Sequence, residues 1–305
     1  MKAVTLTEYG ATPQVDDRPT PKIAPDAVLV RTRYAGVNPV DWKVAGGGLD
    51  ALLYTYFPLT PGWDVAGVVE QVGVAVTEYA PGDEVIAYDR MDTVQHGTYA
   101  ELVPVPVRAL ARKPRSLSWA QAGGLPLAGL TAYQTSQVVE VSKGDTVLIS
   151  NAGGGVGTFA VQICVAAGAR VIGTASPAKS DYLRSLGAEP VAYGDGLLGS
   201  VRALAPDGVD AALDYYGGTA LADLFELTRS PARVASIADA AVRERGGHYV
   251  FVRPDHAGLT ALGDLADAGH LTVHVEREFT LEEVAEAWTA SREGHTTGKI
   301  VLRVE

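Results

Sequence analysis

The chain has 305 residues, enough for about two domains, and its 47% apolar and 20% charged residues predict packed cores rather than disorder. Its formal charge of −11 argues against nucleic acid or an anionic membrane surface as a partner. The sequence has no apolar run of about 18 residues, and its first residues read as a strand rather than a signal peptide, so we expect a cytoplasmic protein without a membrane span. The single cysteine, Cys164, excludes an internal disulfide.

Residues 1 to about 115 predict a β-rich first domain. Val28–Tyr34 alternates between apolar and polar residues, and Asp64–Val72 is a second strand candidate. Turn signals recur at Pro61-Gly62, Pro81-Gly82 and His96-Gly97. Short strands separated by such turns are typical of an all-β domain.

The pattern changes at about residue 116. Six strand candidates follow, at 146–150, 170–174, 190–193, 209–213, 233–237 and 249–252. Helical runs such as Ala178–Leu186 and Thr219–Thr228 separate most of them. Strands that alternate with helices predict a doubly wound parallel sheet, so residues 116–255 are assigned to an α/β domain.

The last fifty residues predict one helix and one strand. The helix candidate is Leu281–Glu293, with Thr280 as N-cap and Glu283 at the capping-box position. The strand candidate is Lys299–Val304. Because a single strand is not stable alone, we expect residues 256–305 to rejoin the β-rich first domain.

A glycine-rich turn, Asn151–Gly157, lies between the strand candidate Thr146–Ser150 and the helical run Thr158–Ala167. Glycines let the backbone approach a pyrophosphate, and the free N–H groups and dipole of the following helix favour its negative charge. Strand, glycine turn, helix and strand in this order predict a dinucleotide site. The residues assigned to it are Gly154, Gly155, Val156 and Gly157.

The segment after the second strand of this unit predicts which dinucleotide binds. Chains selective for NAD place an acid about 20 residues past the glycines, but Thr174–Lys179 contains none. Ser176 offers a hydrogen bond to a 2′-phosphate, and Lys179 offers a positive charge. These residues favour NADPH, and Tyr193 is a further candidate for the same phosphate. The alternative is a helix-capping serine and a solvated lysine.

Seven motifs in a fixed order carry a family resemblance. They are Ala35–Lys43, Pro61–Gly67, Pro81–Val85, Gly97–Glu101, Leu125–Tyr133, Asn151–Gly157 and Gly298–Leu302. The order resembles the medium-chain dehydrogenase/reductase superfamily, and within it the zinc-free quinone oxidoreductase and enone reductase branch. The resemblance implies a GroES-like β domain, a Rossmann domain and a cleft between them. It also places a phosphate-binding serine and lysine at Ser176 and Lys179.

The positions that correspond to zinc ligands argue against a metal. Zinc-dependent relatives need a first cysteine and a histidine, and the matching positions here hold Asn38 and Trp63. Asp64 alone is too few ligands for the ion. We therefore predict that the protein binds no catalytic metal.

Three further residues are cofactor candidates with open alternatives. In relatives, the position of Thr131 lies beside the nicotinamide or its phosphate, and its alternative role is capping or helix packing. Asp214 ends a strand at the carboxyl edge of the sheet, where it either contacts the cofactor or orients the loop. By family analogy Lys299 faces the cleft, and its alternative role is an ordinary strand lysine.

The resemblance implies an NADPH-dependent reductase of quinones or of C=C bonds conjugated to a carbonyl. The protein contributes orientation and electrostatics, because the cofactor supplies the hydride. Asn38 is the candidate that hydrogen-bonds the substrate carbonyl, and Asp41 positions Asn38, relays a proton or caps the loop. Tyr56 and Trp63 are candidates for the apolar walls of the substrate pocket, or else core residues.

Two other functions remain open at this point. The chain is alternatively a specialised reductase of a biosynthetic enone or enoyl intermediate, or an NADPH-binding regulatory protein with negligible turnover. The expected partners are a small quinone or enone and a second copy of the chain in a homodimer. We expect neither a nucleic acid nor a membrane as a partner.

Overall fold

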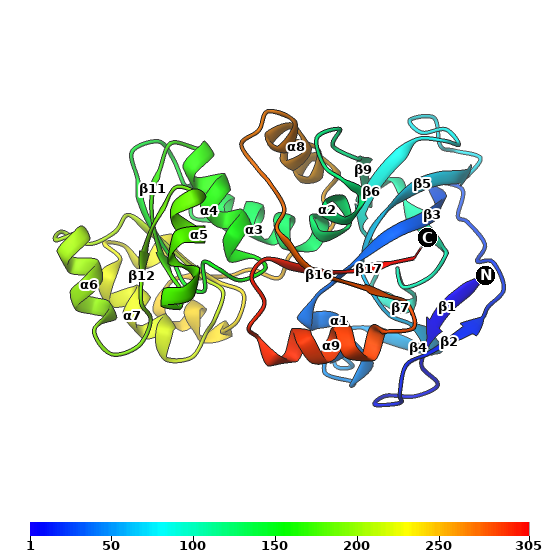
Figure 1. Cartoon of the computed structure of the whole chain (residues 1–305), viewed down its shortest axis with the longest axis horizontal. Coiled ribbons are helices and arrows are strands. Elements are labelled where there is room, and N and C mark those ends of the chain that lie inside the picture. The colour runs from blue at the N-terminus through cyan, green and yellow to red at the C-terminus, as the bar shows by residue number, and fades with distance from the viewer. Residues whose placement is uncertain (305) are drawn as a thin grey trace. The chain divides into compact units, whose positions relative to one another are not determined.

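The computed structural model describes residues 1–304 and separates into two compact units (Figure 1). Unit 1 consists of Met1–Leu130 together with the C-terminal segment from Arg253, and unit 2 is Thr131–Val252. The first division falls inside helix α3 (Pro126–Val138). It therefore lies later in the chain than the boundary after residue 115 that composition suggested.

Unit 1 is built on a seven-stranded sheet in which β17 lies antiparallel beside β3 (Figure 1). Ile300 on β17 is opposite Val37 on β3, so the C-terminal segment completes the sheet of the first unit. The strands, in their order across the sheet, are β16 (Val275–Thr280), β17 (Lys299–Arg303), β3 (Ala27–Val37), β5 (Asp64–Val72), β6 (Glu84–Tyr88) and β9 (Leu110–Arg112), with β8 (Leu102–Pro106) pairing β3 off this path.

Two small sheets and several helices complete unit 1. The small sheets are β1 (Lys2–Thr5) with β2 (Gln14–Asp17), and β4 (Tyr54–Thr60) with β7 (Thr93–His96). The helices are α1 (Pro39–Ala45), η1 (Val107–Ala109), α2 (Trp119–Gly124), α8 (His256–Asp267) and α9 (Val284–Glu293).

Helix α9 begins later than the sequence predicted. Its first residue is Val284 and its N-cap is Glu283, whereas the pattern indicated a helix from Leu281 capped by Thr280. The predicted capping contact is half formed, because the Thr280 amide donates to the Glu283 carboxylate at 2.8 Å. That contact closes a turn before the helix rather than the helix itself.

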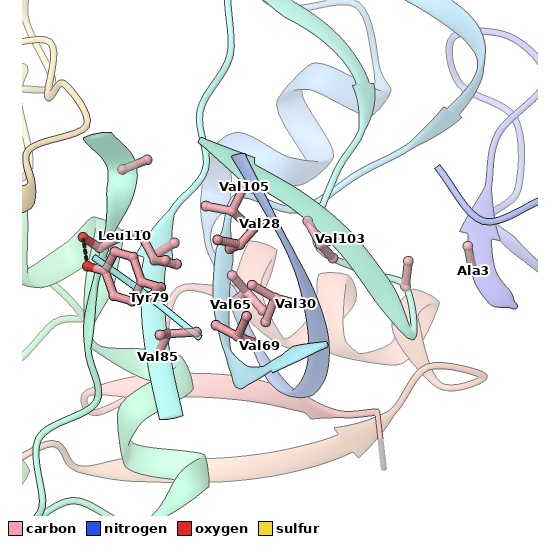
Figure 2. Packing of buried hydrophobic residues seen from close by; sticks show 13 residues of the cluster. Ala3, Val28, Val30, Val65, Val69, Tyr79, Val85, Val103, Val105 and Leu110 are labelled. Atoms are coloured by element: carbon pink, nitrogen blue, oxygen red, sulfur yellow. Dashed lines mark hydrogen bonds between the residues drawn. The ribbon is translucent and has the colours of Figure 1, made fainter. Parts of the chain in front are cut away.

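Alternating residues of the unit 1 strands form its core (Figure 2). Val28 and Val30 on β3 face Val65 and Val69 on β5, as a side-chain period of two requires. Other members are Val85, Val103, Val105, Leu110 and Tyr79. The Tyr79 hydroxyl donates to the Leu110 carbonyl at 3.1 Å, so this polar group is paired within the core.

Unit 2 holds a six-stranded sheet whose neighbouring strands all run parallel. The order is β12 (Ala188–Val191), β11 (Arg170–Thr174), β10 (Thr146–Ile149), β13 (Ala211–Asp214), β14 (Val234–Ser236) and β15 (His248–Tyr249). Chain order reverses at β10, and such a switch point is where open α/β sheets bind ligands. The predicted α/β class with a doubly wound parallel sheet is confirmed.

Short helices connect these strands. They are α4 (Gly157–Ala166), η2 (Pro177–Lys179), α5 (Ser180–Ser185), α6 (Leu197–Leu204), α7 (Thr219–Leu227), η3 (Pro231–Arg233) and η4 (Ala240–Arg245). The predicted helix Ala178–Leu186 is thus a 3₁₀ turn followed by a short α-helix. None of the helices within residues 1–304 has the length and apolar character needed to cross a bilayer.

Candidate functional site

The glycine turn of unit 2 leaves no room for a side chain at Gly157. It connects β10 to α4, and Asn151 enters it with a φ of 49°. A Cβ atom at Gly157 would lie 2.2 Å from the Asn151 carbonyl oxygen and 2.6 Å from the Cα of Ala152. Glycine at this position therefore brings the start of α4 against the end of β10, which is the close approach that a dinucleotide turn requires.

The start of α4 presents backbone amides to an anion. Its first backbone hydrogen bonds run from Thr158 to the Gly154 carbonyl and from Phe159 to the Val156 carbonyl, both at 3.1 Å. The N–H group of Gly157 lies in the first turn, where amides have no intrahelical acceptor, and Gly155 and Val156 immediately precede the helix. These amides, with the positive end of the helix dipole, fit the pyrophosphate of a dinucleotide.

Ser176 and Lys179 follow β11, the strand beside the turn. Ser176 occupies the N-cap position of η2, but its side chain makes no cap hydrogen bond. The Lys179 ammonium donates to the Gly153 carbonyl at 3.5 Å, so the lysine lies against the glycine turn. The structure thus brings the predicted phosphate-binding residues and the turn to one edge of the sheet.

Tyr193 and Thr131 differ in exposure. Tyr193 follows β12 at the same edge of the sheet, and its side chain is 66% exposed. Thr131 is 2% exposed in α3, and its carbonyl accepts a hydrogen bond from the Thr135 hydroxyl at 2.8 Å. Contact of either residue with a cofactor stays a prediction.

Asp214 orients a loop, which is one of the two roles that the sequence offers for it, and its contact with a cofactor stays a prediction. The residue is fully buried at the end of β13. One carboxylate oxygen accepts from the Ser150 hydroxyl at 2.7 Å and from the amides of Tyr216 and Gly217 at 3.1 and 3.0 Å. The other accepts from the Ser236 hydroxyl at 2.7 Å. These four bonds use the carboxylate within the protein and tie three strand ends together.

In unit 1, Asn38 joins β3 to α1. Its backbone is extended, with φ −131° and ψ 150°, as the following Pro39 favours. The Asn38 amide N–H donates to one oxygen of Asp41 at 2.8 Å, and the Tyr99 hydroxyl donates to the same oxygen at 2.7 Å. Asp41 therefore caps the first turn of α1 and fixes the backbone of Asn38.

The Asn38 side chain is held at both ends. Its carbonyl oxygen accepts from the Lys299 ammonium at 2.5 Å, and its amide nitrogen donates to Asp64 at 2.8 Å. Lys299 also donates to the Val37 carbonyl at 3.2 Å, while the second oxygen of Asp64 accepts from the Leu127 amide at 2.7 Å. Asn38 is only 1% exposed, so this network lies inside unit 1.

Burial perturbs the ionisable groups around Asn38. Removal from water raises the pKa of Asp41 to about 7, against the lowering effect of the hydrogen bond from Tyr99. Burial likewise raises the pKa of Asp64 to about 6, although Lys299 opposes the rise. Burial lowers the pKa of Lys299, and the two carboxylates counteract that shift. The second oxygen of Asp41 is buried without a hydrogen-bond partner, so no donor at that oxygen stabilises the charged form of the carboxyl.

The structure adds two residues to the site around Lys299. The Lys299 ammonium donates to Asn38 and Val37 within unit 1, and its contact with a cofactor stays a prediction. Asp64 and Tyr99 were missed as members of the network, although both lie in motifs that the sequence carries, Pro61–Gly67 and Gly97–Glu101.

The two aromatic candidates for a substrate pocket are placed differently. Trp63 is 4% exposed and packs edge-on against Tyr88, with ring centroids 6.1 Å apart, so it is a core residue rather than an open wall. Tyr56 is 55% exposed on β4. Contact of Tyr56 with a substrate stays a prediction.

The residues near Asn38 do not fit a zinc centre. Within residues 1–304, no three His, Cys, Asp or Glu side chains gather closely enough to hold an ion. Both oxygens of Asp64 already accept hydrogen bonds, and the positions expected for soft ligands hold Asn38 and Trp63. Zinc requires about four ligands from such groups, which this donor set does not supply.

Comparison with known proteins matches both units of the chain. A family model described as an alcohol dehydrogenase GroES-like domain matches residues 24–115, and one described as a zinc-binding dehydrogenase matches residues 186–302. An NADPH-dependent alkenal/one oxidoreductase of Arabidopsis thaliana, named as chloroplastic, is 33% identical over 99% of this chain and 79% of its own length.

Two solved structures are similar throughout. An alcohol dehydrogenase superfamily protein from Novosphingobium aromaticivorans has a TM-score of 0.91 and 30% identity, with full coverage of both chains. The quinone oxidoreductase from Coxiella burnetii has a TM-score of 0.86 and 29% identity, covering 100% of this chain and 99% of its own. The likeness therefore extends over both units.

Proposed function

The chain belongs to the medium-chain dehydrogenase/reductase superfamily, in its zinc-free quinone oxidoreductase and enone reductase branch, and on this basis we propose that it is an NADPH-dependent reductase. Its substrates are quinones or C=C bonds conjugated to a carbonyl. The observation that carries the choice of cofactor is the position of Lys179 against the glycine turn, at the switch point of the parallel sheet.

Unit 2 supplies the cofactor-binding residues in this proposal. The amides of Gly154–Gly157 bind the pyrophosphate, while Ser176 and Lys179 bind the 2′-phosphate that distinguishes NADPH from NADH. Tyr193 and Thr131 are further contacts. When bound, NADPH supplies the hydride, and the protein contributes its binding and orientation.

Unit 1 supplies the group that stabilises the substrate oxygen. Reduction of a conjugated acceptor places negative charge on its carbonyl oxygen, and a fixed hydrogen-bond donor stabilises that charge. The Asn38 amide nitrogen carries two hydrogens, and Asp64 accepts one of them. We assign the second to the substrate oxygen. Asp41 and Tyr99 support this role by fixing the Asn38 backbone.

The proposal also includes a cellular location and an oligomeric state. We assign the protein to the cytoplasm, as a homodimer. Because the Arabidopsis relative is named as chloroplastic, fractionation of the source cells is the direct test of location. Sedimentation of the purified chain of 31.9 kDa distinguishes a dimer from a monomer.

A substrate panel tests the reductase. Purified protein is mixed with NADPH and a series of quinones, alkenals and enones, and oxidation is followed by the loss of cofactor absorbance, with NADH in parallel. We expect turnover with at least one acceptor class and faster turnover with NADPH at low concentration. Binding of NADPH without turnover of any acceptor would instead support the regulatory alternative.

A further inference from the structure

We propose that Lys299 and Asp64 are positioning residues for the Asn38 amide: both hold its orientation, and Lys299 polarises it so that its second N–H becomes a stronger hydrogen-bond donor. This inference rests on the proposed function, because it assigns the strengthened N–H to the oxygen of the reduced acceptor. Both residues act through Asn38 without contacting the substrate.

The geometry fixes the amide plane from two sides. Lys299 comes from β17 and Asp64 from the start of β5, while Asn38 lies between β3 and α1. The ammonium meets the amide oxygen and the carboxylate meets one N–H, so rotation of the side chain breaks both contacts. A 180° exchange of oxygen and nitrogen would place the ammonium against a donor and the carboxylate against an acceptor. Only one orientation of the amide is therefore compatible with its neighbours.

The contact with Lys299 polarises the amide electronically. An amide is a hybrid of a neutral form and a dipolar form, with negative charge on oxygen and positive charge on nitrogen. The Lys299 ammonium at the oxygen favours the dipolar form through a charge-assisted hydrogen bond, and the N–H that Asp64 does not engage consequently becomes more acidic and donates more strongly. Asp64 fixes the orientation in which that N–H is presented. Lys299 and Asp64 are 3% and 0% exposed, so water screens this effect little.

Stability alone does not account for charged groups at these positions. Burying an ammonium and a carboxylate removes both from water, and neutral residues of similar size often replace such pairs without loss of stability. Neutral side chains also suffice to hydrogen-bond an amide. The charge of Lys299 is explained if the polarity of Asn38 itself is used, and the charge of Asp64 then favours the buried ammonium.

The first test compares steady-state kinetics of single variants. Lys299→Met keeps the length of the side chain and removes its charge, and we expect kcat to fall by about 100-fold, as misplacement of a reacting group typically causes. The dissociation constant for NADPH is expected to remain that of the wild type. Lys113→Met is the matched control, since Lys113 is a largely buried lysine of unit 1, 8% exposed at its side chain and paired with Glu84. Its kcat is expected to be unchanged.

A double-variant cycle shows whether Lys299 acts through Asn38. In the Asn38→Ala background, Lys299→Met is expected to lower kcat little further, because the group on which it acts is already gone. Equal losses in both backgrounds would overturn the proposal. Should Lys299→Met fail to fold, the charge-neutral pair Lys299→Met with Asp64→Asn replaces it, and wild-type kcat in that folded variant likewise overturns the proposal.

The amide can be observed directly, because the chain contains only two asparagines, Asn38 and Asn151. Labelling asparagine with ¹⁵N gives two pairs of side-chain amide signals, assigned by an Asn151→Ser variant. We expect the Asn38 protons downfield of those of Asn151, and a return upfield when Lys299→Met, alone or with Asp64→Asn, removes the charge. Unchanged Asn38 signals would refute polarisation.

The two proposals fail in distinguishable ways. If the wild type reduces no quinone or enone, the reductase assignment is wrong, whatever the amide signals show. If the wild type is active and Asn38→Ala is impaired but Lys299→Met is not, the reductase assignment holds and the positioning role is wrong. Loss of activity in Lys299→Met, together with an upfield shift of its Asn38 side-chain amide signals, supports both proposals.

Discussion

The side chain of Lys179 packs against Gly153 in the glycine turn. The lysine ammonium is 3.5 Å from the Gly153 carbonyl oxygen, and a Cβ atom at Gly153 would come within 2.8 Å of the Lys179 Cδ. The contact directs a positive charge to the edge of the sheet where the amides of the glycine turn are presented. A phosphate at this edge would meet both an ammonium and the positive end of a helix.

Lys179→Ala is therefore expected to weaken NADPH binding by about 10- to 150-fold, the value of one charge-assisted hydrogen bond, and to leave NADH binding nearly unchanged. NADH lacks the 2′-phosphate that the lysine would contact. Fluorescence titration of both cofactors measures the difference. Lys143→Ala is the control, because Lys143 packs against Gly168 in the same unit but precedes β10. Equal wild-type affinity for the two cofactors would contradict the assignment.

Gly157→Ala is expected to abolish cofactor binding and to lower the melting temperature. The new Cβ would lie 2.2 Å from a backbone oxygen, which cannot move away as a flexible side chain can. Overpacking of this kind costs about 1–3 kcal/mol. Gly199→Ala in α6 meets nothing within 4 Å and is expected to stabilise by about 0.4–1 kcal/mol. Tight NADPH binding by Gly157→Ala would show that the turn does not hold the phosphates.

Asn38→Ala is expected to reduce kcat by about 10²–10³-fold, the usual effect of removing one donor to a developing oxyanion. NADPH affinity should remain at the wild-type value, because the Asn38 contacts lie in unit 1. The measurement combines kcat, cofactor affinity and melting temperature in one variant. Normal turnover with a lowered melting temperature would leave Asn38 a structural role only.

The raised pKa of Asp41 is expected to make the free energy of unfolding depend on pH. Burial raises its pKa to about 7 from the ordinary 3.8, so the folded protein binds this proton more tightly than the unfolded chain. The stabilisation that this proton provides is complete below the pKa of Asp41 in the unfolded chain, and it is lost as the pH rises through about 7. The Asp41→Asn variant cannot titrate here, and its melting temperature should decline less than that of the wild type between pH 4 and about 8. The size of the difference is of order a few kcal/mol at most.

The groups that share this site with Asp41 are Asp64, Lys299 and Tyr99. They remain in the variant, so the difference between the two pH profiles isolates Asp41. Parallel profiles for the wild type and Asp41→Asn would show that the carboxyl does not titrate in this range.

Activity is expected to be independent of metal. Elemental analysis of the purified protein should find no stoichiometric zinc, and turnover should persist after treatment with a chelator. The physical reason is the donor set, in which Asn38 and Asp64 already bond to each other at 2.8 Å. Activity that falls with chelator and returns with zinc would overturn this expectation.

The sequence predicted the positions of those strands and turns that local residue patterns determine. The apolar run Asp64–Val72 is β5 with the same bounds, and the glycine turn lies between β10 and α4 as its spacing required. Helix α9 was misplaced because the Thr280–Glu283 capping contact forms before the helix starts. Side-chain period and capping signals locate elements, but they locate ends only within a turn.

Local sequence patterns could not predict the hydrogen-bond network around Asn38, because its members come from distant parts of the chain. Lys299 is 261 positions from Asn38 and is brought to it only because β17 pairs with β3. The sequence motif marks Asp64 only as a possible metal ligand, and its role as a hydrogen-bond acceptor for Asn38 depends on the pairing of β5 with the end of β3. Asp214 stands at a ligand-binding edge, yet two serines of neighbouring strands engage its carboxylate. Such partners depend on tertiary structure.

The pairing of β17 with β3 also sets an order of assembly on the ribosome. Unit 2 is one continuous segment and is complete once residue 252 has emerged, whereas the sheet of unit 1 lacks β17 until residues 299–303 are made. Domains generally fold as units during synthesis, and here the segment encoded first is completed last. Until β17 is made, β3 lacks one of its antiparallel neighbours, and Asn38 lacks the hydrogen bond from Lys299. The closing strand brings both the missing hydrogen bonds and the missing charge in a single step.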